Sequence, residues 1–281
     1  MSEKPGSDFF AGIPQVDVWA AGRKVKLPIF YRDARAHLAI FPAGLRALKR
    51  LLPDPRFSPA HFLPGIGAVA LASFEYYDTD VGPYNEFAFN ILLNNPHMLP
   101  LPGYNLLRQL VQFNFYPYIH RLPVTTEEAL RWGIDFSGFP KFLASIEFSD
   151  SDQWMTCELK EGKDLICRVK GRKIAAPWSR VMKFLIRLYQ HRQPQTTEFK
   201  VNARQFGISI NPGDVELELG TNHYMARELA DTLLLRRSLM YFYIPSVQFA
   251  LYGPEKLSLP LVHFLLQQGM RIPLDQLKDK S

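Results

Sequence analysis

The chain has 281 residues, of which 47% are hydrophobic and 13% aromatic, enough for a sizeable buried core. Its formal net charge of +6 comes from 33 basic and 27 acidic residues, spread along the chain without a long block of one sign, and this does not favour a nucleic-acid partner. No apolar run approaches the ~20 residues of a membrane-spanning helix, and the start, MSEKPGSDFF, lacks the apolar centre of a secretory signal. We therefore predict a cytoplasmic protein with no membrane partner.

The first third of the chain predicts an arm, several strands and one helix. Residues 1–15 are polar and small enough for a flexible arm, and the alternation in 16–32 predicts two short strands around Gly22. A helix is expected at about 43–52, between Pro42 and Pro53, with its leucines on one face. The segments 67–78 and 83–93 are rich in β-formers and are separated by the turn-like TDVG, so they should pair as neighbouring strands.

The middle of the chain predicts a strand, a capped helix and a hairpin. A strand at 118–122 precedes Thr125 and Thr126, which can cap a short helix ending at Gly133. The hairpin 154–171 places Cys157 and Cys167 on either side of its turn, opposite each other. In a reducing compartment we expect two small apolar residues on one sheet face, not a disulfide, and two cysteines without a nearby histidine pair do not complete a zinc site.

The basic stretch 178–192 carries apolar residues at helical spacing: Val181, Phe184, Leu185 and Leu188. Its basic side chains fall mostly elsewhere, which favours a helix with a solvated face over a phosphate or membrane patch.

The last third predicts strands at 197–205 and 214–220, a helix at 221–235 capped by Thr221, and a strand region at 238–253. Residues 254–281 are expected to be a C-terminal appendage with a helix near 259–269. We predict a single domain over 16–253. Strands carry its middle and helices punctuate it, which indicates an α+β fold.

Common nucleotide, zinc-protease and serine-hydrolase motifs are absent from the sequence, and the seven histidines are scattered. The unusual segment is GIDFSGFPKF (133–142), where Lys141 lies between Pro140 and Phe142 with Asp135 as the other charged residue. A lysine in apolar surroundings has a lowered pKa, and its neutral amine can attack a carbonyl to form an imine. The alternative is a lysine whose stem covers apolar surface while its ammonium reaches water.

The run GIDFSGFPK resembles the segment that carries the Schiff-base lysine of acetoacetate decarboxylases, and DTDVGPYNEF (78–87) resembles that family's turn followed by Tyr-x-Glu. The early YRD (31–33), the helix ending in LLP and the late TNH helix match in the same order, so the resemblance covers about residues 20–253. It implies a closed or cone-like, mostly antiparallel β-barrel with peripheral helices, a buried cavity and a homo-oligomer.

The resemblance also implies the site residues. Lys141 would form the imine with a keto acid and Glu86 would position the substrate or move a proton, without a metal or an organic cofactor; the alternative for Glu86 is a solvent-facing strand residue. Substrate contacts are expected from Arg23, Tyr84, Phe139 and Phe142; Arg23 aligns with a one-residue shift, and a surface arginine is the alternative. Acetoacetate decarboxylase is a standard case of an activated lysine, so this property is carried over with the resemblance.

Two departures from the family bear on the substrate. The family's second lysine is Phe142 here, and a further family glutamate falls near Ala72, whereas the available acid, Glu75, is on the opposite strand face. A larger, more apolar keto acid would suit Phe142. The leading hypothesis is a lyase that decarboxylates a β-keto acid; the alternatives are aldolase or dehydratase chemistry on an α-keto acid, or a barrel that binds a small apolar ligand without catalysis.

Overall fold

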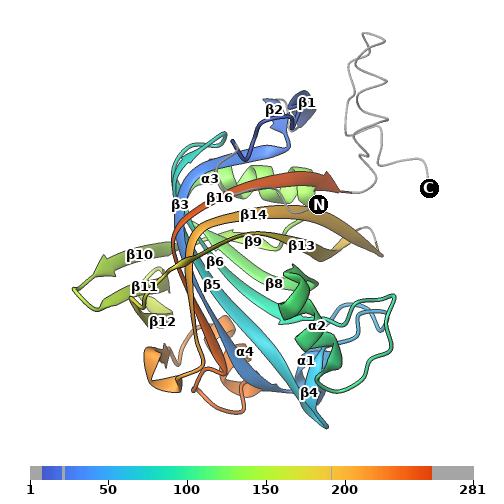
Figure 1. Ribbon diagram of the computed structural model, residues 1–281, viewed down its shortest axis with the longest axis vertical. Helices are drawn as coiled ribbons and strands as arrows, with labels where there is room; N and C mark the ends of the chain where they lie inside the picture. Colours follow the sequence, from blue (N-terminus) through green and yellow to red (C-terminus); the bar gives the residue numbers. More distant parts are fainter. Residues whose placement is uncertain (1–7, 21–22, 191, 255–281) are drawn as a thin grey trace.

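The computed structural model describes residues 8–20, 23–190 and 192–254 (Figure 1). The first part of the predicted arm and the predicted helix near 259–269 lie outside the described residues. Within the described part of the arm, Phe9 is buried and its ring packs against Phe10, which in turn contacts Phe30. At least this section of the arm is therefore anchored on the main body.

Seven long strands close into a mixed barrel. Along the barrel the strands follow the order β13 (Trp178–Gln190), β14 (Gln193–Ser209), β16 (Met240–Pro254), β3 (Ile29–Gly44), β5 (Ile66–Thr79), β6 (Tyr84–Leu92) and β8 (Pro117–Val124). Neighbours pair antiparallel, except that β8 closes the barrel by a parallel pairing of Tyr118 with Arg187 on β13. The predicted closed, mostly antiparallel barrel is thus confirmed.

Short strands and a second sheet surround the barrel. The short strands are β1 (Val16–Ala20), β2 (Arg23–Leu27), β4 (His61–Leu63), β7 (Asn114–Phe115) and β9 (Lys141–Leu143). The second sheet is antiparallel, in the order β10 (Ser145–Asp150), β11 (Trp154–Glu161), β12 (Asp164–Arg172) and β15 (Val215–Leu219). Figure 1 shows β10, β11 and β12 projecting to one side of the barrel.

The helices are peripheral, as predicted. They are α1 (Leu45–Leu51), α2 (Tyr104–Gln112), α3 (Glu127–Arg131), the π-helix η1 (Trp132–Ser137), the 3-10 turn η2 (Pro212–Asp214) and α4 (Tyr224–Thr232). Figure 1 shows α2 near β4, away from α3. The predicted helix at 221–235 is shorter than expected, because His223, not Thr221, caps its first turn by accepting a hydrogen bond from the amide of Met225. No helix among the described residues combines the length and the apolar character needed to cross a membrane.

Side chains alternate between the two faces of the barrel wall. On β5 and β6 the outward positions are large, with Val69, Leu71, Phe87 and Phe89 packed against the second sheet and α4. The inward positions on the same strands include several alanines. One of the two large core clusters therefore lies outside the wall, between the barrel and the second sheet, and the other includes residues that face the barrel interior.

The predicted helix at 178–192 is wrong, because this segment is β13. Its apolar residues fit two periods at once: Phe184, Leu185 and Leu188 have helical spacing, whereas Met182, Phe184 and Ile186 alternate. The segment forms a strand because it pairs with β14 along its whole length. The alternating residues Met182, Phe184 and Ile186 point into the barrel.

The hairpin 154–171 is confirmed as β11 and β12. Its cysteines are not directly opposite: Cys157 faces Val169 and Cys167 faces Leu159, so they are diagonal neighbours on one buried face. Both thiols are free, and burial raises the pKa of Cys157 to about 12. These cysteines are part of the core between the barrel and the second sheet.

Candidate active site

Lys141 and Glu86 form a buried ion pair inside the barrel. Nζ of Lys141 donates a hydrogen bond of 2.8 Å to Oε2 of Glu86, and the side chains are 6% and 11% exposed. Strand pairing brings them together, since Lys141 on β9 lies beside Leu122 on β8, and Val124 on β8 pairs with Glu86 on β6. A lysine with its nitrogen in solvent, the alternative considered from the sequence, does not describe this side chain.

The segment before Lys141 explains how the lysine is aimed inward. The chain leaves α3 through η1 and turns at Gly138, whose φ of 66° lies in the left-handed region that glycine tolerates. Gly133 provides space for the stem of Lys141, because a Cβ at this position would overlap Cδ and Cε of the lysine. Gly133 of the GIDFSG motif therefore serves the placement of Lys141, and Gly138 permits the turn that precedes it.

Three buried tyrosines surround the ion pair. The hydroxyl of Tyr76 donates to Oε1 of Glu86 at 3.2 Å, that of Tyr84 lies 3.5 Å from Oε2, and the hydroxyls of Tyr31 and Tyr84 are 3.2 Å apart. Burial, followed by the negative charge of Glu86, raises the pKa of each phenol above its usual range. All three stay protonated at neutral pH, so Tyr76 and Tyr84 are donors that face the carboxylate.

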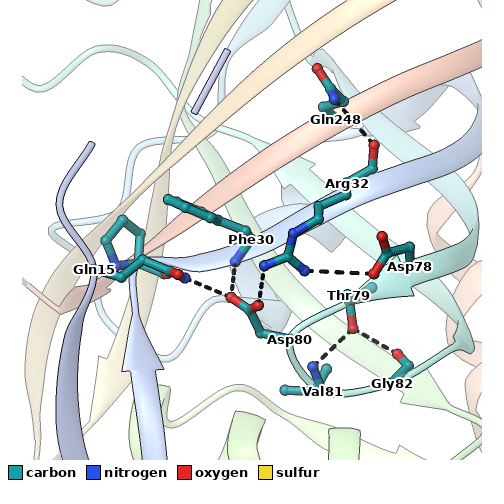
Figure 2. A network of polar contacts seen from close by, with 10 residues as sticks. Gln15, Phe30, Arg32, Asp78, Thr79, Asp80, Val81, Gly82 and Gln248 are labelled. Carbon is teal, nitrogen blue, oxygen red and sulfur yellow. Dashed lines mark hydrogen bonds and ion pairs between the residues drawn. The ribbon is translucent and has the colours of Figure 1, made fainter. Parts of the chain in front are cut away.

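A polar network at the β5–β6 turn holds the strands that carry these tyrosines (Figure 2). The Asp80 carboxylate accepts hydrogen bonds from Gln15 Nε2 at 2.6 Å, the Phe30 amide at 2.8 Å and Arg32 at 2.5 Å. The Thr79 hydroxyl donates to the Gly82 carbonyl at 2.6 Å across the predicted TDVG turn. The network joins the start of β3 to the β5–β6 turn, and gives the YRD and DTD motifs a structural role.

A cavity of about 440 Å³ fills the barrel lumen and ends at the ion pair. Most of its lining residues are aliphatic or aromatic. The few polar lining residues are Tyr31, Tyr76, Glu86, Asn90, Gln109 and Lys141. A deep, largely apolar pocket with convergent polar groups at one point is typical of a small-molecule site.

The other predicted contact residues have different positions. Phe139 lines the lumen with its ring centre 5.9 Å from Lys141 Nζ, and the Tyr84 ring centre lies 5.5 Å from the same atom. The prediction for Phe142 is corrected: it packs outside the lumen, near the rings of His223 and Tyr224. Successive strand residues point to opposite faces, so an inward Lys141 forces Phe142 outward.

The prediction for Arg23 concerns a side chain outside the described part of the structure; its backbone begins β2 and pairs with Ala20. Ala72, where the family's further glutamate was expected, lines the lumen, whereas Glu75 lies on the outer face and pairs with Arg35 at 2.5 Å. The lumen thus has no carboxylate from the described part of β5.

Sequence reasoning missed Tyr31 and Tyr76 as site residues. Tyr76 lies two and four residues after Phe74 and Ala72 on one strand face, and Tyr31 opens the YRD motif, so alternation along β5 and the motif itself were available signals. Among the described residues, no three His, Cys, Asp or Glu side chains gather in an arrangement that could hold a metal ion.

The model of the acetoacetate decarboxylase (ADC) family matches residues 16–250. The chain belongs to this family. A search of curated proteins found no match.

Several solved structures share the fold. A structure described as acetoacetate decarboxylase matches with a TM-score of 0.54 at 15% identity, covering 80% of this chain and 87% of its own. Acetoacetate decarboxylase from Legionella pneumophila gives 0.53 at 15% identity, covering 80% and 86%. The enduracididine biosynthesis enzyme MppR, complexed with pyruvate, gives 0.54 at 11% identity, covering 82% and 90%. These identities show the fold alone.

Proposed function

We propose that this protein decarboxylates a β-keto acid through an imine with Lys141. The observation that carries the proposal is the buried contact between Lys141 Nζ and Glu86 Oε2 at the end of an apolar lumen. Membership of the acetoacetate decarboxylase family supports it. In this reaction class the lysine must be a nucleophile, and a nearby base must take its proton.

The reaction begins with proton transfer from the Lys141 ammonium to Glu86, which leaves a neutral amine. The amine attacks the keto carbon, and loss of water gives a protonated imine. The bond between the α-carbon and the carboxylate then breaks, carbon dioxide leaves, and the electron pair moves into the imine to give an enamine. Protonation of the α-carbon and hydrolysis release a ketone and regenerate Lys141.

The apolar lumen favours the bond-breaking step. In the lining formed by the described residues, Lys141 is the one basic side chain, so the substrate carboxylate would face apolar side chains and tyrosine hydroxyls. Transfer from water into such surroundings destabilises a carboxylate relative to departing neutral carbon dioxide. Tyr76 and Tyr84 would keep the Glu86 carboxylate oriented while the proton moves.

A second candidate is aldol or dehydration chemistry on an α-keto acid, because the same protonated imine stabilises a carbanion at the adjacent carbon. The relative MppR is described in complex with the condensation product of pyruvate and imidazole 4-carboxaldehyde. The third candidate, a barrel that binds a small apolar ligand without catalysis, would leave Lys141 buried and unreactive.

Measurement of carbon dioxide and ketone released from β-keto acids separates these candidates. The Lys141→Arg variant keeps the positive charge but cannot form an imine, so its rate should fall to the uncatalysed background. Lys160→Arg, which alters a surface lysine on β11 paired with Glu158, is the matched control and should retain the wild-type rate. Equal rates for the wild type and Lys141→Arg would refute the proposal, and imine formation with pyruvate without carbon dioxide release would favour the aldol branch.

A further inference from the structure

Alanines on the inner face of three adjacent strands leave the lumen empty. All of them line the cavity and are at most 3% exposed: Ala36 on β3, Ala68, Ala70 and Ala72 on β5, and Ala88 on β6. Small barrels normally fill their interior with side chains. Here the alanines alternate with larger inward residues such as Leu38, Ile40 and Phe74, and beside the alanines the space inside is available to a ligand.

The lumen is long. Its lining on β6 extends from Glu86 to Leu92, and at ~3.3 Å per residue this is about 20 Å of strand. The cavity volume is about 440 Å³. A four-carbon keto acid would occupy only a small part of this length and volume, whereas a linear alkyl chain could extend along it.

Chemical polarity is confined to one end of the lumen. Lys141, Glu86 and the tyrosines lie at the reactive end. Further along, the amide of Asn90 is directed to the backbone carbonyls of Ala70 and Ala88, at 3.3 and 3.4 Å. Gln109 donates to the Leu93 carbonyl at 2.9 Å and accepts from the Tyr116 amide at 3.1 Å. The Asn90 amide nitrogen and both ends of the Gln109 amide are engaged within the protein, so the rest of the lumen offers a ligand mainly apolar contact.

The end of the lumen far from Lys141 reaches the molecular surface. Leu107 on α2 and Leu239 before β16 line the cavity there, and they are 62% and 39% exposed. Lys141 and Glu86, in contrast, are almost fully buried. An apolar chain anchored at Lys141 would therefore extend along the alanines toward α2.

We propose that the substrate is a β-keto acid with a linear alkyl tail, the β-keto derivative of a medium- or long-chain fatty acid. This rests on the proposed function and specifies its substrate. The keto carbon reacts at Lys141 and the tail lies along the inward alanines. The products are carbon dioxide and a methyl ketone, because a proton replaces the lost carboxylate on the α-carbon.

A chain-length series tests this inference in the wild-type protein. The probes are freshly prepared acetoacetate, β-ketocaprylate, β-ketolaurate and β-ketopalmitate, with kcat/KM measured from carbon dioxide release. Each buried methylene is expected to raise kcat/KM about fourfold until the tail spans the lumen, after which the value levels off. If acetoacetate reacts as well as β-ketolaurate, the inference fails and the proposed function stands; if no chain length reacts, both fail.

Filling the lumen provides an independent test. The Ala70→Phe variant places a ring where the tail would reside, whereas a small keto acid needs only to pass this point. The ratio of kcat/KM for β-ketolaurate to that for acetoacetate should fall at least about tenfold. Ala175→Phe, at an exposed loop position, is the matched control and should keep the wild-type ratio.

A second variant nearer the surface keeps this test decisive if Ala70→Phe does not fold. Ala68→Leu should lower the kcat/KM ratio of β-ketolaurate to acetoacetate less than Ala70→Phe does. Its main effect should be on the corresponding ratio for β-ketopalmitate, whose tail reaches further. A ratio that stays at the wild-type value in the folded variants would overturn the inference.

Discussion

The hydroxyl of Tyr76 donates a hydrogen bond of 3.2 Å to Oε1 of Glu86, the carboxylate oxygen that Lys141 does not contact. Glu86 is thus held from both sides, by an ammonium on one oxygen and a buried phenol on the other. A carboxylate fixed in this way presents a defined lone pair to the amine from which it must take a proton.

Removal of the Tyr76 hydroxyl should slow the reaction without unfolding the protein. In Tyr76→Phe the ring packing remains but one donor to Glu86 is lost, so we expect kcat to fall about tenfold, at the low end of acid–base effects. Tyr77→Phe is the matched control, since its hydroxyl is on the opposite face and bonds Glu75 at 2.8 Å. Equal losses in both variants would show that Tyr76 has no particular role at the site.

Replacement of Glu86 by Gln should affect both rate and stability. Without the carboxylate, Lys141 lacks its proton acceptor and its counter-ion, so we expect kcat to fall about 100-fold and the free energy of unfolding to fall by about 3 kcal/mol. Steady-state kinetics and urea denaturation check the two effects. Glu147→Gln on the exposed face of β10 is the control, and wild-type kcat in Glu86→Gln would exclude Glu86 from proton transfer.

The space at Gly133 should be essential for the position of Lys141. In Gly133→Ala the added methyl overlaps the lysine stem and moves Nζ away from Glu86, so imine formation should fall at least about tenfold. Gly44→Ala is the control, because a Cβ there meets neighbouring atoms no closer than 3.8 Å. Trapping of a keto acid with reductant measures the effect, and unchanged trapping would contradict the role given to Gly133.

Stability should decline on mild acidification because of His37. Burial lowers the pKa of this histidine from 6.5 to about 4, and neither ring nitrogen has a hydrogen-bond partner among the described residues. The unfolded chain therefore binds a proton more readily than the folded one, so stability present above pH 6.5 is lost as the pH falls toward 4. The loss is at most about 3 kcal/mol.

The His37→Phe variant should reduce this acid sensitivity and, since it removes unpaired polar atoms, should not destabilise the protein at neutral pH. The exposed His97→Phe variant should retain the wild-type pH dependence. The test is to measure the denaturation midpoints of the wild type and both variants between pH 4 and 7. A His37→Phe curve parallel to that of the wild type would contradict the assignment.

The sequence predicted the elements whose signals are local and unambiguous. The β5–β6 pair, the TDVG turn and the hairpin with Cys157 and Cys167 follow from alternation and turn residues. The prediction of a helix at 178–192 failed because helical and strand periods coexist in this segment. Only its pairing with β14 decides between them. The helix α2 has no counterpart among the predicted elements.

The site was predicted in part, through short motifs. These led to Lys141 and Glu86, but their contact depends on strand order, in which β8 lies between β6 and β9. The outward direction of Phe142 follows from simple alternation once Lys141 points inward. The family resemblance implied a buried cavity, but its lining by alanines could not be predicted, because an alanine reveals a cavity only when the facing strands are known. Cytoplasmic location and homo-oligomeric assembly stay predictions, which fractionation and size-exclusion chromatography would check.

The most direct test of the account is reductive trapping at Lys141. The wild-type protein is incubated with a β-keto acid and borohydride, digested, and analysed by mass spectrometry, with Lys141→Arg in parallel. We predict that the peptide containing Lys141 gains the mass of one reduced adduct, and that the variant gains none. Absence of an adduct, or an adduct on another lysine with Lys141 unmodified, would contradict the central claim.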